Sequence, residues 1–166
     1  MRPPVHLRRA RPEDLAAVGE ATVAAYASFV AGRNDPYLDK LRDAGARDRE
    51  AELWVAVAED DRTVLGSVTL CPDGSSWREV ARGDEGEFRM LAVDPAAQGQ
   101  GVGLALVEHC LDHFREQGAP AVVISSLTEM SAAHRLYGRL GFERLPDRDW
   151  SPLPGVDLIC FERVLA

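Results

Sequence analysis

The segment that most limits the possible folds is the glycine-rich stretch at residues 98–103, Gln-Gly-Gln-Gly-Val-Gly. It lies between a predicted strand at 87–93 and a predicted helix at 101–117, in which apolar side chains recur on one face. Glycine lacks a Cβ atom, and the first N–H groups of a helix have no internal partner, so this backbone can approach and bind an anion, usually a phosphate. The sequence therefore predicts a central strand–loop–helix unit with a phosphate-binding turn.

Two common phosphate-binding signatures do not fit this turn. The Walker pattern requires Gly-Lys followed by Ser or Thr, and the chain contains no such tripeptide. The dinucleotide fingerprint requires Gly or Ala three residues after its second glycine, Gly101, where this chain has Leu104. At this point two interpretations stay open: another phosphate ligand, or a helix start whose glycines only allow tight packing of helix against strand.

The predicted elements alternate between strands and helices, which indicates a mixed α/β domain. In chain order we expect a strand at 5–9, helices at 12–31 and 37–50, strands at 53–58, 63–70 and 87–93, a helix at 101–117, a strand at 121–125, a helix at 130–140, and strands at 142–145 and 156–164. Residues 71–86 form a long polar connection, and loops of that length are usually functional or mobile. A length of 166 residues fits one domain.

The net charge and the cysteine content limit which binding partners and which cellular compartment are expected. The net charge is −8, so nucleic acid is a poor partner and a cationic small molecule is accepted more easily. Cys71, Cys110 and Cys160 lie far apart and form no C-x-x-C pair, which favours a reducing compartment over a disulfide framework. No stretch approaches the ~20 apolar residues that span a bilayer, and the first residues lack the apolar run of a signal peptide. We therefore expect a cytoplasmic protein that binds neither nucleic acid nor membrane.

Two motifs resemble those of one family. Residues 98–103 match the Gln/Arg-x-x-Gly-x-Gly/Ala signature of the GNAT superfamily of N-acetyltransferases, and residues 91–95, Leu-Ala-Val-Asp-Pro, resemble the end of that family's central strand. Residues 133–142, Ala-His-Arg-Leu-Tyr-Gly-Arg-Leu-Gly-Phe, resemble its second signature, A-x-x-L-Y-x-x-x-G-F. The resemblance is clear over about residues 87–145, and it implies an α/β (α+β) fold. We expect one GNAT-like domain over residues 1–166, with a mixed central sheet of about six to seven strands flanked by about four helices.

The resemblance also implies acetyl-CoA as co-substrate. The residues expected to hold its pyrophosphate through their N–H groups are Gln98, Gly99, Gln100, Gly101, Val102, Gly103 and Leu104. The residues expected to pair their backbone with the pantetheine arm, as an added strand would, are Leu91, Ala92 and Val93. The family often has Asn at the position of Met130, and we expect this difference to remove one hydrogen bond to the coenzyme.

Acyl transfer to an amine needs a group that accepts a proton from the amine and one that protonates the departing thiolate. By the resemblance, Tyr137 is the general acid, and a backbone N–H near Leu91 meets the oxyanion. Related enzymes often place a basic carboxylate on the central strand, so Glu87 is the candidate base, acting directly or through water. Period-two alternation would put Glu87 on the same side of that strand as Arg89 and Leu91; the alternative is a solvated acid at the end of a strand.

Other candidate residues point to weaker roles. His109 and His113 lie four residues apart on one predicted helix, but no Glu completes an H-E-x-x-H motif and no further ligand is evident, so we expect no metal site. Trp77 and Trp150 lie on polar loops and are candidates for walls of the acceptor pocket.

The combined prediction is an enzyme, an acetyl-CoA-dependent N-acetyltransferase. It moves an acetyl group to a primary amine of a small molecule or protein by direct attack in a ternary complex. The alternative of the same fold is a non-catalytic module that binds or senses acyl-CoA. A homodimer is a further possibility, because dimers are common among relatives.

Overall fold

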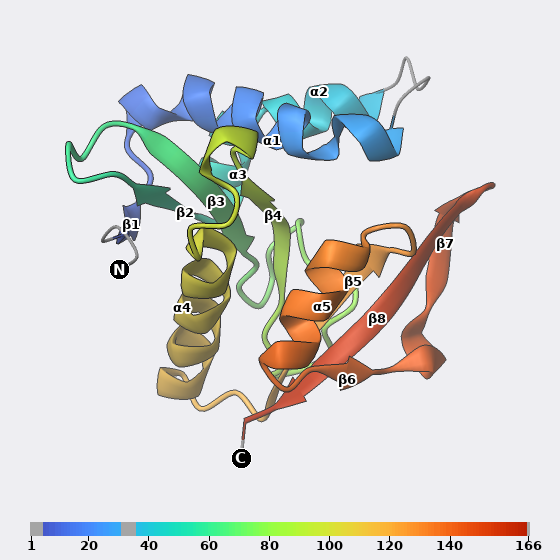
Figure 1. The fold of residues 1–166 in the computed structure, drawn as a ribbon. Helices are drawn as coiled ribbons and strands as arrows, with labels where there is room; N and C mark the ends of the chain where they lie inside the picture. The colour runs from blue at the N-terminus through green and yellow to red at the C-terminus, as the bar shows by residue number, and fades with distance from the viewer. Residues whose placement is uncertain (1–4, 31–35, 166) are drawn as a thin grey trace.

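The computed structural model describes residues 5–30 and 36–165 (Figure 1). The elements are, in chain order, β1 (His6–Arg9), η1 (Pro12–Asp14), α1 (Leu15–Val30), α2 (Pro36–Arg42), α3 (Ala44–Glu50), β2 (Glu52–Val57), β3 (Val64–Leu70), β4 (Phe88–Val93), η2 (Pro95–Ala97), α4 (Val102–Glu116), β5 (Ala121–Leu127), α5 (Ser131–Arg139), β6 (Glu143–Arg144), η3 (Pro146–Arg148), β7 (Trp150–Leu153) and β8 (Val156–Val164). The predicted mixed α/β fold is confirmed. No helix within these ranges is both long and apolar enough to cross a membrane.

The strands form two sheets rather than one continuous sheet. The first is antiparallel with the order β1-β2-β3-β4, and the second has β8 paired with β5, β6 and β7. Within the described ranges, the sheets are joined by one parallel bridge, between Gly86 and Val122. Beyond this bridge β4 and β5 are not paired, so the two sheets separate and leave an opening between neighbouring parallel strands.

Two differences from the predicted elements have local causes. The helix expected at 37–50 is two helices, because Asp43 leaves the helical conformation and its side chain accepts a hydrogen bond from the Ala46 N–H at 3.0 Å, starting α3. Strand β7 lies in a segment expected to be a loop. Pro152 is compatible with this strand because β7 pairs on one side with β8, and edge strands tolerate proline.

Helices cover both faces of the first sheet (Figure 1). Alternate residues of β2 separate the two layers: Val55 and Val57 pack in the cluster that includes Val18 of α1, whereas Ala56 packs in the cluster that contains the buried face of α4. Helix α4 lies close to the sheet because Gly66 has no side chain: a Cβ there would lie 2.9 Å from a side-chain carbon of Val102 and 3.2 Å from one of Leu106, both on α4.

A buried arginine fixes the position of α2. Arg47 is fully buried; its Nη1 donates to the carbonyl oxygens of Lys40 at 3.0 Å and Leu41 at 2.9 Å, and its Nη2 donates to the Thr22 hydroxyl at 3.4 Å. The carbonyls are at the C-terminal end of α2, where they have no partner within the helix. Arg47 therefore joins α2 to α1 and α3, and holds α2 beside the opening between the sheets.

Candidate active site

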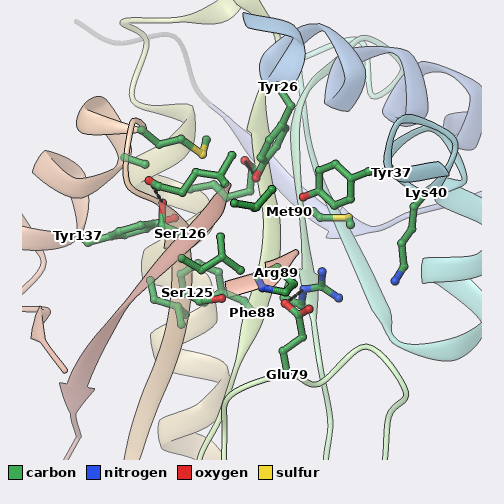
Figure 2. A pocket seen from close by; sticks show the side chains of 18 of the residues that line it. Tyr26, Tyr37, Lys40, Glu79, Phe88, Arg89, Met90, Ser125, Ser126 and Tyr137 are labelled. Atoms are coloured by element: carbon green, nitrogen blue, oxygen red, sulfur yellow. Dashed lines mark hydrogen bonds and ion pairs between the residues drawn. The ribbon is translucent and has the colours of Figure 1, made fainter. Parts of the chain in front are cut away.

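A cavity of about 210 Å³ lies where the two sheets separate (Figure 2). Its walls come from β4, β5, α5, the β7–β8 hairpin, α1, α2 and the loop before β4. The lining residues are Tyr26, Tyr37, Lys40, Glu79, Phe88, Arg89, Met90, Leu91, Ile124, Ser125, Ser126, Leu127, Met130, Ala133, Tyr137, Pro152, Leu153, Val156 and Leu158. Figure 2 shows Tyr137 on one side, Lys40 on the opposite side, and Arg89 beside Glu79 at the lower end. The cavity thus brings together residues from seven parts of the chain.

A bulge in β4 changes the orientation of its side chains. Met90 has a φ of +53°, and the pairing with β3 passes from Thr69↔Arg89 to Ser67↔Ala92 across it. As a result, Arg89 and Met90 both lie on the side of Trp77, and Leu91 packs against the opposite core. The expected alternation, with Glu87, Arg89 and Leu91 on one side, is therefore interrupted at Met90.

The bulge also leaves two residues of β4 without a partner on β3. Met90 and Leu91 have no partner in the β3–β4 register, and both line the cavity. The Leu91 carbonyl oxygen accepts a hydrogen bond from the Tyr26 hydroxyl at 3.2 Å. Of the backbone expected to pair with a pantetheine arm, Leu91 lines the cavity, whereas the side chain of Ala92 is buried in the core beneath α1 and α2.

The turn before α4 has the conformation that the glycine pattern predicts. Gly99 and Gly101 have φ values of 81° and 80°, which a residue with a side chain rarely adopts. Gly101 is the N-cap of α4, and no side chain caps the helix start. The first N–H groups of α4 are therefore available to an anion. Gly103 also allows α4 to pack closely against α5, because a Cβ there would lie 3.3 Å from the side chain of Leu136.

Tyr137 projects from α5 into the cavity. Its side chain is buried and packs among the aromatic rings of Phe88, Phe142 and Phe161. Burial raises the pKa of the Tyr137 hydroxyl well above its ordinary value, so the group stays protonated at neutral pH. No hydrogen-bond partner for this hydroxyl is present in the described part of the chain, and a thiolate in the cavity could accept its proton.

Glu87 is not in the cavity. It is fully buried, and its Oε1 accepts hydrogen bonds from the N–H groups of Glu79, Val80 and Ala81 at 3.0, 2.9 and 2.9 Å. Burial raises the pKa of the Glu87 carboxyl, and these three N–H groups act in the opposite direction by stabilising the carboxylate. The bonding makes Glu87 an anchor for the loop before β4, and its burial places it outside the lining of the cavity.

The carboxylate that does reach the cavity is Glu79, at the part of the loop that Glu87 holds. Its Oε1 lies 2.9 Å from Nε of Arg89, and its side chain is 25% exposed. Burial raises the pKa of Glu79, and the nearby Arg89 and Lys40 partly offset this effect. The sequence carried no signal for Glu79, because its approach to the cavity depends on how a long loop folds back on β4.

The two tryptophans support this region without lining the cavity. Trp77 is 5% exposed and its Nε1 donates to Oε2 of Glu50 at 2.7 Å, so the ring lies behind the wall that Arg89 and Lys40 form. Trp150 packs with Val80 and other residues of a separate small cluster.

The histidine pair lies away from the cavity. His109 stacks on Trp54 with ring centroids 4.0 Å apart, and His113 contacts Phe114. Among residues 5–30 and 36–165, no group of three or more His, Cys, Asp or Glu side chains is arranged to hold a metal ion.

An anchoring role for Glu87 predicts a loss of stability on replacement. We expect Glu87→Gln to lower the free energy of unfolding by about 2 kcal/mol, because hydrogen bonds to a charged acceptor are replaced by weaker ones to an amide. Urea denaturation measures this change. In the matched control Asp73→Asn, an exposed carboxylate of the same loop paired with Arg78, the change should stay below about 0.5 kcal/mol. Unaltered stability together with a turnover loss above about 10²-fold would instead assign Glu87 to the chemistry.

Comparison with known proteins gives concordant results. Residues 19–142 match the model of the acetyltransferase (GNAT) family. Over 138 residues the chain is 36% identical to a mycothiol acetyltransferase from Cellulomonas flavigena; the alignment covers 75% of this chain and 40% of that protein, so the chain spans less than half of the length of this relative.

Solved structures share the fold. The crystal structure of a GNAT-family acetyltransferase from Staphylococcus aureus Mu50 superimposes with a TM-score of 0.75 at 14% identity, covering 98% of this chain and 100% of that one. A GNAT-family acetyltransferase from Brucella melitensis, in complex with acetyl-CoA, gives a TM-score of 0.64 at 24% identity, covering 98% of this chain and 89% of that one.

Proposed function

The chain belongs to the GNAT acetyltransferase family, and from this premise we propose that it transfers an acetyl group from acetyl-CoA to a primary amine by direct attack in a ternary complex. The observation that carries the proposal is the cavity between β4 and β5, which has a protonated phenol on one wall and a carboxylate on another. The name of the Cellulomonas flavigena relative, a mycothiol acetyltransferase, supports acetyl transfer. The proposal takes residues 1–166 as one domain.

Binding of the coenzyme is assigned to two backbone segments. The N–H groups of residues 98–104 would hold the pyrophosphate, since Gly101 leaves the start of α4 uncapped. The backbone at residues 91–93, beginning with Leu91, which has no partner residue on β3, would bind the pantetheine arm. Met130 also lines the cavity, where its thioether supplies an apolar contact in place of an amide. When bound, acetyl-CoA would supply the acetyl group as an activated thioester, a reactive group that no side chain of the protein provides.

The roles of acid and base follow from the positions of the two ionisable side chains. Glu79 accepts the proton that the amine loses as the new C–N bond forms. Tyr137 donates a proton to the sulfur as the C–S bond breaks, and its raised pKa keeps that proton available at neutral pH. The oxyanion would lie near the backbone N–H groups at the bulge, at Met90 and Leu91, which have no partner residue in the β3–β4 register. Glu87 contributes by holding the loop that presents Glu79.

The test is release of free thiol from acetyl-CoA in the presence of a panel of primary amines, with the acetylated product identified by mass spectrometry. Cys71, Cys110 and Cys160 are all buried, so a thiol-reactive dye should report coenzyme A with little background from the protein. Amine-dependent thiol release is expected. Binding of acetyl-CoA without thiol release with any amine would contradict the proposal and would indicate the non-catalytic sensing module.

The role of Glu79 predicts a specific pH dependence. A base must be deprotonated to act, so kcat/KM should rise with pH through a pKa that lies above the ordinary 4.5 of a glutamate. We expect Glu79→Gln to lower kcat/KM by about 10²-fold and to remove this rise, as for loss of general base catalysis. A Glu79→Gln profile with the same limb as the wild type would show that another group is the base.

A further inference from the structure

The ionisable side chains on the cavity wall do not balance in charge. Among the described residues that line the cavity, those charged at neutral pH are Lys40, Glu79 and Arg89. These two cations and one carboxylate give the cavity wall a net charge of +1, whereas the whole chain has a net charge of −8. Lys40 is also the only lysine in the sequence. The cavity is thus locally positive within an acidic protein.

Both cations lie against the same indole ring. Nζ of Lys40 is 5.2 Å from the centre of the Trp77 ring, and Cζ of Arg89 is 5.6 Å from it. The hydrogen bond from Trp77 to Glu50 fixes the ring itself. Trp77 therefore holds two like charges on one wall, and of these Arg89 is paired with Glu79 at 2.9 Å.

Part of the donor capacity of these cations is unused. Nε of Arg89 contacts Glu79 at 2.9 Å, and Nη1 donates to the Trp77 carbonyl oxygen at 3.1 Å. Within the described residues Nη2 of Arg89 makes no hydrogen bond and is not sealed from solvent, and Nζ of Lys40 has no carboxylate within ion-pair distance. Figure 2 shows both groups at the edge of the same cavity. Arginine and lysine with free donors are a suitable site for a carboxylate.

We propose that the acceptor is a small amine that also carries a carboxylate, and that Lys40 and Arg89 bind this carboxylate while the amine lies toward Glu79. This inference rests on the acetyl-transfer function proposed above. The carboxylate neutralises the excess positive charge, and Glu79 accepts the proton that the amine loses when it acts as the nucleophile. The volume of about 210 Å³ is below the ~300–1,000 Å³ of typical ligand pockets, which favours an amino-acid-sized molecule over a protein acceptor.

The experiment measures binding, so that it does not depend on turnover. The N-acetyl derivatives of the twenty standard amino acids, which are products of the proposed reaction, are titrated calorimetrically as free acids and as matched carboxamides, with and without coenzyme A. We expect at least one acid to bind roughly 10–100-fold more tightly than its amide, the effect of charge-assisted hydrogen bonds. Lys40→Gln should reduce this preference about 10-fold and leave binding of the amide unchanged.

The matched control is Arg42→Gln, which removes one positive charge from the exposed face of the same helix, where Arg42 pairs with Glu20. It should leave the preference for the acid intact. Equal binding of acids and amides, no binding of any acid, or a preference that survives Lys40→Gln would overturn the carboxylate site. Acetyl transfer to simple amines in that case would leave the proposed function standing, whereas absence of thiol release with all amines would contradict the function independently of this site.

Discussion

Replacement of Gly101 by aspartate is expected to abolish binding of coenzyme A while leaving the protein folded. Aspartate tolerates a positive φ better than most residues, and its carboxylate at position 101 would lie beside the free N–H groups at the start of α4. A phosphate would then meet a negative charge about 4 Å away, which costs about 4 kcal/mol at an effective dielectric constant of 20. The dissociation constant for coenzyme A, measured by calorimetry, should therefore rise about 10³-fold.

The control for this variant is Gly118→Asp, at the opposite end of the same helix. Gly118 has a similar positive φ of 75°, so the variant introduces the same charge and comparable backbone strain away from the proposed phosphate site. It should bind coenzyme A as the wild type does. If Gly101→Asp retained full affinity for coenzyme A, the turn at residues 98–104 would not be the pyrophosphate site.

The second large effect is expected for Tyr137→Phe, which removes only the hydroxyl group. We expect kcat to fall by about 10²–10⁴-fold, the range for loss of a general acid, with little change in affinity for coenzyme A. The aromatic ring that packs against Phe88, Phe142 and Phe161 remains, so stability should change little. Because the pKa of Tyr137 is raised, the wild-type enzyme should show no alkaline loss of kcat from this group below pH ~10.

A second tyrosine of the same cavity provides the comparison. In Tyr26→Phe the hydrogen bond to the Leu91 carbonyl is lost, and kcat should fall less than about 10-fold, as for one neutral hydrogen bond. Steady-state kinetics at saturating acetyl-CoA measures both variants. Equal kcat in Tyr137→Phe and the wild type would remove Tyr137 from the mechanism.

The parts of the site that could be predicted are those encoded within a few neighbouring residues. A helix start without a side-chain cap follows from Gly99, Gly101 and Gly103, and α4 begins and ends within one residue of its predicted limits. The position of Tyr137 on a helix that ends before Gly141 follows from the spacing of its motif, and the structure places it in the cavity.

The bulge at Met90 and the contacts of Glu87 could not be predicted in this way. A positive φ at methionine is set by pairing with β3 and not by the type of residue, and it changes which side chains of β4 face the cavity. Glu87 meets the N–H groups of residues 79–81 only when the preceding loop folds back on the strand. The sequence pattern therefore predicts a carboxylate on the central strand but carries no sign that the carboxylate of Glu87 binds the preceding loop.

The sequence by itself determined the family, the mixed α/β fold, the uncapped glycine turn before α4 and the position of Tyr137 on α5, because each depends on short-range backbone geometry and motif spacing. Only the tertiary structure decided that Glu79, Arg89 and Lys40 share one cavity. These three residues come from a loop, a strand and a helix, and their proximity depends on the separation of the two sheets, on the anchoring of the loop by Glu87 and on the clamp that Arg47 makes between α1 and α2. Such contacts between distant segments leave no local pattern in the sequence, because the charges around each of these side chains depend on how the other segments pack against it.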